Sequence, residues 1–549
     1  MTAYHNIPNY KLKEDKPVIE KYSRRMLATI LSYFSHTDYD EVYSKNHINY
    51  LDKYFKKKNV ISILVEYPYI DKDYLEDYSA YYARSYSDYK KRTIRLHFFR
   101  KGVTMNVINN HLNRKQTNHD RLQKAYVGYM VVRPIPKTMI GKTVIETYPD
   151  KKEEGRIYPV KRKYHTHLFG IELQVDTIGY QEQDNAVAAC ATSALWSIFQ
   201  STAFLFQHKI PSPAEITRMA TEHSTVPARS FPSKGLTIEQ IAGCVKQLQL
   251  ETQYHDAYTY NILKGYIKAY LNAQIPVFLG VSLFDNIKKE FLGEHALAVN
   301  GFSGTLVKST NYFGQGCSDQ RLYLRSSRIN KIFVHDDQVG PFARMEFDDP
   351  FNKLVCLKGN EGTAYYSSLS TDWNQVEQKP TSVRAVPNTV LITLYHKIRI
   401  PFDEVLEIVA AINEYLNDFS PVDPLIDEWD ILLDRNSEYK KKLLGQDPGH
   451  PSLSGDYATS ILTKSLPRFF WRALAYKDDI PLFEIIFDAT DISEGKLFLD
   501  LVCYDFEYCD FFYRFMKNRT RYSVIENRQA RHSIGLMMNI LKKMFGSSR

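Results

Sequence analysis

The stretch from Tyr180 to Phe206 constrains the fold more than any other part of this 549-residue chain. It reads YQEQDNAVAACATSALWSIFQSTAFLF, a polar turn that ends at Cys190 and then apolar residues three and four positions apart. This spacing predicts a helix whose first residue is Cys190. The first N–H groups of a helix have no partners inside it, and the helix dipole is positive there. A cysteine at this position is therefore favoured as a thiolate.

A chain of this length exceeds one ordinary core, and its patterns predict three domains. Residues 1–171 alternate helical and strand-like segments and predict an α+β domain. Residues 172–350 hold the Cys190 helix, further helices and buried strands. Residues 351–549 predict a second α+β domain, in which 421–470 is a loop-rich stretch with many Pro, Asp, Gly and Ser residues. The predicted fold class is multidomain α+β.

Charge separates the N-terminal part from the rest. Residues 1–175 contain 32 Lys and Arg against 19 Asp and Glu, although the whole chain has a net charge of only +8. Such a surface has an acidic protein or a nucleic acid as its candidate partner, although lysine clusters are more often plain solvated faces.

The sequence begins without the basic segment and apolar run of a secretory signal, and no stretch approaches the roughly 18 apolar residues of a membrane span. We therefore expect a cytoplasmic protein with no membrane partner. Six cysteines without a Cys-x-x-Cys pair argue against a disulfide framework and a structural zinc site. We expect neither a metal nor a cofactor, because His165 and His167 share a strand face but have no third ligand in view.

The middle domain contains the four groups that a cysteine hydrolase needs: a nucleophile, a base, a group that orients the base, and oxyanion donors. Cys190 is the candidate nucleophile. His295 opens an apolar strand and is the candidate base, and Asp336 ends the next strand, where it would orient the imidazole. Gln183, seven residues before the cysteine, would bind the oxyanion together with the Cys190 backbone N–H.

Each of these residues also has an ordinary interpretation. A cysteine that opens an apolar helix is more often a small buried residue than a nucleophile, and a histidine beside a strand is usually a satisfied core or surface residue. Asp337 and Asp349 compete with Asp336 for the third role. Only the combination of the four residues favours catalysis.

The order of these segments resembles the papain-like cysteine peptidase superfamily, and within it the bacterial double-glycine-type peptidases. The resemblance rests on Gln-x6-Cys-Ala, the strand IPVFLGV, the strand EHALAVNGF and the turn DDQVG, and it covers residues 172–350 only. It implies a papain-like middle domain in which Cys190, His295, Asp336 and Gln183 have the roles given above. Ala191 stands where many members have glycine, Asp337 where they have proline, and residues 304–330 lengthen the interval between base and acid.

We therefore expect a papain-like thiol hydrolase that acts on a protein or peptide, most simply a peptidase with a Cys-His-Asp triad and a thioester intermediate. A deamidase or a transglutaminase-type acyl transferase would use the same triad. Two alternatives come from other classes: a non-enzymatic interaction protein that keeps the papain-like core as a scaffold, and a nucleic-acid-binding protein that uses the basic N-terminal region.

Overall fold

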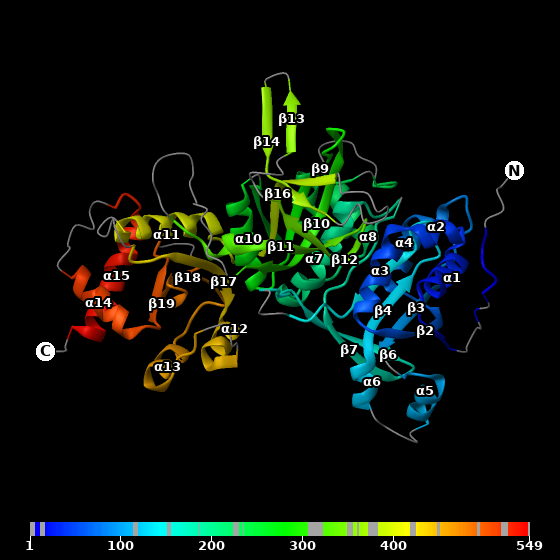
Figure 1. Ribbon diagram of the computed structural model, residues 1–549, viewed down its shortest axis with the longest axis horizontal. Helices are drawn as coiled ribbons and strands as arrows, with labels where there is room; N and C mark the ends of the chain where they lie inside the picture. Colours follow the sequence, from blue (N-terminus) through cyan, green and yellow to red (C-terminus); the bar gives the residue numbers. More distant parts are fainter. Residues whose placement is uncertain are drawn as a thin grey trace. The chain divides into compact units, whose positions relative to one another are not determined.

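The computed structural model describes residues 6–10, 12, 17–100, 102–113, 119–150, 155–184, 186–222, 230–233, 235–257, 259–305, 322–348, 355–359, 362–371, 383–417, 424–446, 451–490, 495–517 and 525–546. The chain folds into two compact units (Figure 1). Unit 1 comprises residues 1–258, 275–303 and 331–393, and unit 2 comprises residues 259–274, 304–330 and 394–549. Every helix of the described residues is too short or too polar to cross a bilayer.

Unit 1 begins with a five-stranded antiparallel sheet in the order β1-β2-β3-β4-β5. A separate ribbon, β6-β7, packs its apolar side chains Leu168 and Leu173 into the same core as Leu64 and Val131 of the sheet. The strands are β1 (Val18–Lys21), β2 (Val60–Tyr69), β3 (Thr93–Arg100), β4 (Tyr126–Val132), β5 (Ile140–Ile145), β6 (Arg162–Leu168) and β7 (Ile171–Thr177).

Six helices accompany this sheet, and Figure 1 shows α1 and α3 beside its strands. Helix α1 begins where Ser23 accepts a hydrogen bond from the Met26 N–H, and it buries one side formed by Leu27, Ile30 and Leu31. The helices are α1 (Arg24–Ser35), α2 (Tyr39–Ser44), α3 (Asn46–Lys57), α4 (Lys72–Ala80), α5 (Met105–Leu112) and α6 (His119–Ala125).

The second sheet of unit 1 has the strand order β15-β12-β11-β10-β9-β16-β8. Because β15 also pairs with β16, the six strands from β15 to β16 in this order close into a ring. Strand β8 pairs with β16 outside the ring. The strands are β8 (Leu250–Asp256), β9 (Val277–Asp285), β10 (Glu290–Gly304), β11 (Ile329–Asp336), β12 (Gly340–Phe347), β15 (Leu369–Ser370) and β16 (Val383–Tyr395). A two-stranded ribbon, β13 (Val355–Gly359) and β14 (Gly362–Tyr366), is separate.

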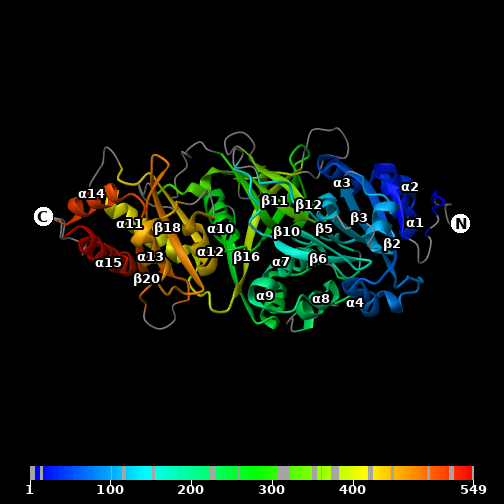
Figure 2. The ribbon, with the colours of Figure 1, turned by 90° about the horizontal axis from the view of Figure 1, so that it is seen from below.

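Three helices accompany the second sheet: α7 (Cys190–Phe206), α8 (Pro213–Glu222) and α9 (Ile238–Gln247). Figure 2 shows α8 and α9 beside α7. Helix α7 is buried on all sides, since only Cys190 and Phe204 of its 17 residues are not buried. Its Ser197 hydroxyl bonds to the Gly179 carbonyl and to His335 Nδ1 of β11. The cysteine at the start of this helix is therefore held by a firmly packed element.

Unit 2 is built on a four-stranded antiparallel sheet in the order β17-β18-β19-β20. The fully buried guanidinium of Arg472 pairs with Asp434 at 2.9 Å and Glu484 at 2.6 Å. The elements are α10 (Tyr260–Asn272), α11 (Phe402–Asn417), β17 (Glu428–Arg435), α12 (Asn436–Lys441), α13 (Gly455–Leu462), β18 (Phe469–Lys477), β19 (Ile480–Asp488), β20 (Phe498–Cys503), α14 (Phe506–Met516) and α15 (Arg528–Phe545).

The α+β fold class is confirmed, whereas the division into three domains stays a prediction. The five-stranded sheet and the Cys190 helix lie in the same compact unit. A domain that ended at residue 350 would lack β15 and β16, although β16 pairs with β9 from Val383 to Ile392. The expectation of a loop-rich stretch at 421–470 was wrong, because β17, α12 and α13 lie there.

Candidate active site

Cys190 is the first residue of α7, as the sequence predicts, and its side chain is half-buried. Ala189 precedes it in an extended conformation and provides no side-chain cap, and the first turn has no acidic residue. The positive end of the helix dipole therefore faces the thiol without a competing side-chain acceptor on the helix itself.

The turn before Cys190 is closed by Asp184, whose side chain is buried. Its Oδ1 accepts hydrogen bonds from the backbone N–H groups of Ala186 (2.8 Å), Val187 (2.5 Å) and Ala188 (3.1 Å). The Asp184 N–H in turn donates to the Ala188 carbonyl at 2.9 Å. One carboxylate thus fixes the direction in which the chain enters α7.

His295 lies in β10, where it is only 7% exposed. The strand begins at Glu290, five residues before the position that the sequence indicates, because Glu290 pairs with Asp285 across the turn from β9. His295 itself is opposite Val281. The imidazole is therefore held by a paired strand rather than by a loop.

Asp336, the last residue of β11, is the nearest carboxylate to His295 in the described structure. Its Oδ1 lies 3.0 Å from His295 Nε2 and also accepts a hydrogen bond from the Gln338 N–H at 2.9 Å. The competing Asp337 is farther, with Oδ1 3.6 Å from the same nitrogen. Asp349, the third candidate, lies outside the described residues, as do residues 306–321 of the predicted insertion.

The Cys190 thiol lies close enough to the His295 ring that a side-chain hydrogen bond between them is among the effects that raise the pKa of the ring. Because Nε2 faces Asp336, Nδ1 is the ring nitrogen left for the sulfur. The tertiary structure therefore brings together three residues that lie on three different elements and span about 146 positions of sequence. This order, thiol to imidazole to carboxylate, can transfer a proton between the sulfur and a bound substrate.

The charge state of His295 is set by opposing effects. Burial lowers the pKa of the ring, but the charges of Asp336 and Asp337 and the hydrogen bonds with Asp336 and Cys190 raise that pKa well above its ordinary value. Burial also raises the pKa of Asp337 to about 7, while the His295 charge lowers it and the Asp336 charge raises it. These directions favour an imidazolium at His295 and a proton on Asp337 up to about neutral pH.

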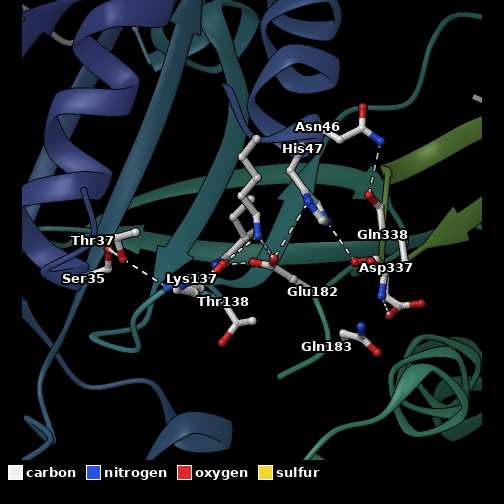
Figure 3. Close-up of polar contacts among 12 residues, drawn as sticks. Ser35, Thr37, Asn46, His47, Lys137, Thr138, Glu182, Gln183, Asp337 and Gln338 are labelled. Atoms are coloured by element: carbon white, nitrogen blue, oxygen red, sulfur yellow. Dashed lines mark hydrogen bonds and ion pairs between the residues drawn. The ribbon is translucent and has the colours of Figure 1, made fainter. Parts of the chain in front are cut away.

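Gln183 is half-buried on the same turn as Asp184. Its side chain makes no hydrogen bond within the described residues, and its carbonyl accepts a long one from Arg133 Nη2, at 3.4 Å. Figure 3 shows Glu182 pointing toward His47 and the Gln183 side chain pointing away from it. Within the described residues, the Gln183 side chain thus has no competing hydrogen bond, and no hydrogen bond joins it to Cys190, His295 or Asp336.

Three polar residues, Glu182, Lys45 and Arg133, form a supporting layer around the site. Glu182 is buried, pairs with Lys45, and accepts the Ile140 N–H at 3.0 Å. Arg133, also buried, donates to the Glu182 carbonyl at 3.1 Å. The adjacency of Glu182 to Gln183 is the only sequence cue to this layer, since its other members come from distant segments.

Two groups bear on metal binding. Among the described residues, His295, Asp336 and Asp337 form a cluster that could hold a metal ion. Their ligand atoms lie within 4.8 Å of one another. A protonated imidazole offers no lone pair to a metal, so the raised pKa of His295 opposes this use. His165 and His167 lie on one exposed strand face, as expected, and His165 Nδ1 is 2.6 Å from Glu172.

A scan against protein-family models found no match to this chain, and no curated protein matches it.

Proposed function

We propose that the protein is a thiol hydrolase of the papain-like type that cleaves an amide bond in a protein or peptide. The observation that carries this proposal is the position of His295, which hydrogen-bonds Asp336 through Nε2 and lies beside the Cys190 thiol, whose side chain helps to raise the pKa of the ring. Peptidase, deamidase and acyl-transferase reactions all begin with formation of a thioester on the cysteine. Among them, a peptidase is the simplest proposal, because water is its only second substrate.

In the proposed mechanism, the Cys190 thiolate attacks the substrate carbonyl carbon and the C=O electron pair moves to the oxygen. The Cys190 N–H and the Gln183 side chain would stabilise that oxyanion. The imidazolium of His295 then protonates the leaving amine as the C–N bond breaks, which leaves a thioester on Cys190. His295, now neutral, takes a proton from water, the resulting hydroxide attacks the thioester, and the acid product leaves with Cys190 regenerated.

Asp336 has a supporting role in this scheme. It holds the ring in the orientation that points Nδ1 at the sulfur, and its negative charge stabilises the imidazolium. Because Asp336 also accepts the Gln338 N–H, its carboxylate is fixed from two directions. Because the carboxylate is already fixed, little further entropy is lost in ordering it during the reaction.

The test is selective alkylation of the full-length chain with iodoacetamide between pH 5 and pH 8, with the labelled cysteine identified by mass spectrometry. Only an activated thiol reacts rapidly at pH 6, because an ordinary thiol is almost fully protonated there. We expect rapid labelling of Cys190, loss of that labelling in Cys190→Ala, and a strong decrease in His295→Gln. Slow labelling of Cys190 at pH 6 in the native protein would contradict the proposal.

Burial of His295 favours a second candidate, a non-enzymatic scaffold that keeps the site as a structural core. The two candidates differ in substrate turnover. Mass-spectrometric profiling of new peptide termini in a cell extract should show products with the native chain and none with Cys190→Ala. Identical profiles from the two proteins, together with rapid labelling at pH 6, would favour the scaffold.

A further inference from the structure

Helix α3, from the predicted N-terminal domain, lies against the turn that carries Asp336. Three side chains of this helix bond backbone carbonyls of the turn and of the start of β12. Asn46 Nδ2 donates to the Gln338 carbonyl at 3.4 Å, His47 Nε2 bonds the Asp337 carbonyl at 2.8 Å, and the Tyr50 hydroxyl donates to the Pro341 carbonyl at 2.7 Å.

The turn is also closely packed against the helix at Gly340. This residue has φ +151°, and a Cβ atom there would lie 2.5 Å from the Tyr50 ring. Only glycine fits this approach without displacing the ring. The backbone of the acid turn is therefore held by both hydrogen bonds and packing from α3.

His47 is the centre of this contact, because it faces two loops at once (Figure 3). A carbonyl oxygen can only accept, so Nε2 carries the proton and donates to Asp337. The other ring nitrogen, Nδ1, lies 3.8 Å from Glu182 Oε1, on the loop that continues into Gln183. The ring is 4% exposed, so neither contact is shared with solvent.

Charge around His47 agrees with a neutral ring that acts as a hydrogen-bond donor. Burial and the Lys45 charge lower the pKa of His47, while Glu182, Asp336 and the bond to the Asp337 carbonyl raise it, with a net decrease. Lys45 neutralises Glu182 and also donates to the Lys137 carbonyl at 2.6 Å. The neutral ring therefore holds the Asp337 carbonyl through Nε2, while Lys45, the residue before α3, pairs with Glu182 on the other loop.

We propose that His47 is a positioning residue for the active site, and that α3 completes the site by fixing the turn of Asp336 relative to the loop of Gln183. This inference rests on the proposed function. Asp336 is one peptide bond from the carbonyl that His47 holds, so release of that carbonyl moves the carboxylate away from His295 Nε2. A misplacement of about 1 Å in such a group lowers catalytic rates by roughly 100-fold.

The experiment compares His47→Gln with His47→Asn in the full-length chain. A glutamine amide reaches about as far as Nε2 and can still donate to the Asp337 carbonyl, whereas an asparagine amide is too short. The readout is the pH profile of Cys190 alkylation by iodoacetamide. We expect His47→Gln to keep the native profile within about threefold, and His47→Asn to lose at least 10-fold of the labelling rate at pH 6.

The matched control is His97→Asn. His97 is another fully buried histidine of unit 1, bonded to Tyr126 at 3.0 Å and Glu66 at 3.1 Å, and it does not contact the site. Its loss should decrease thermal stability and leave the alkylation profile of the folded protein unchanged. A merely structural role for His47 would give the same result as this control.

The outcomes separate the two proposals. Slow labelling of the native protein at pH 6 contradicts the proposed function itself. Rapid labelling of the native protein together with equal profiles for His47→Gln and His47→Asn overturns only the role of His47. Tyr50→Phe, which removes one donor to the same turn, provides a second test, and an unchanged profile in both Tyr50→Phe and His47→Asn would exclude positioning by α3.

Discussion

Asp336 and Asp337 are neighbours in sequence, are both buried and both face His295, yet their geometry differs. Asp336 is within hydrogen-bonding distance of Nε2, and its carboxylate is also fixed by the Gln338 N–H. Asp337 is 0.6 Å farther, and its Oδ1 has no hydrogen-bond partner within the described residues. Burial is the main cause of the raised pKa of Asp337, and the charge of the neighbouring Asp336 raises it further.

We predict different effects for the two amide substitutions. Asp336→Asn removes a hydrogen-bonded charge worth about 1.5–3 kcal/mol, so Cys190 alkylation at pH 6 should fall about 10- to 100-fold. Asp337→Asn replaces a group that is already protonated near neutrality and should change the rate by less than about threefold. The alkylation rates of both variants decide which carboxylate orients His295. A larger loss of rate in Asp337→Asn than in Asp336→Asn would identify Asp337 as the third member of the triad.

The stability of Asp337→Asn should depend on pH in a defined direction. The pKa of Asp337 is raised from 3.8 to about 7, so its proton stabilises the folded state. This contribution is complete below pH 3.8 and is lost as pH rises through about 7. Because the amide does not titrate, the variant should gain about 2–3 kcal/mol relative to the native protein between pH 5 and pH 8. Urea unfolding at the two pH values measures this difference, and a constant difference would contradict the shift.

Among the elements, helix α7 and the turn before it are stabilised by different interactions. The body of α7 is apolar and buried all round, which fixes the helix in unit 1. The turn is polar, and one carboxylate of Asp184 satisfies three backbone N–H groups. Packing thus holds the helix, while hydrogen bonds determine where its first residue points.

We predict that Asp184→Ala destabilises unit 1 and impairs Cys190 together. Three buried N–H groups would lose their acceptor, at a cost of about 1–3 kcal/mol for each group that water does not reach. The matched control is Asp184→Asn, which keeps one oxygen acceptor and should lose less stability. Thermal unfolding and Cys190 alkylation at pH 6 measure the two effects. A variant Asp184→Ala with native stability would show that the turn does not depend on this carboxylate.

On the scale of the whole molecule, the candidate site draws on segments far apart in the chain. The acid turn near residue 336 is held by α3, about 290 residues earlier, and β9 pairs with β16, about 100 residues later. The site therefore depends on residues on both sides of the predicted domain 172–350.

We predict that a fragment containing only residues 172–350 does not form a reactive site. It lacks α3, so the carbonyls of Asp337, Gln338 and Pro341 lose their donors, and it lacks β16, so one edge of β9 is unpaired. The expected results are no cooperative urea transition and no rapid alkylation of Cys190 at pH 6, with the full-length chain as the control. Cooperative unfolding with rapid labelling would show that the middle domain is independent.

The sequence by itself determined much of the local structure. It placed the start of α7 at Cys190, which the structure confirms. This feature depends on residues within a few positions of one another, so its physical cause is visible in a single segment. The order of Cys190, His295 and Asp336 also suggested the site that the fold then brought together.

Only the tertiary structure decided which polar residues are paired and buried. The sequence EWDILLDR of β17 looks irregular because acidic residues interrupt it, yet Asp434 is buried against Arg472 and Glu428 against Arg328. The sequence around His47 gives no sign that this histidine bonds the Asp337 carbonyl and lies beside Glu182. A buried charge or imidazole is stable only beside its partner, and distant parts of the chain provide that partner after folding.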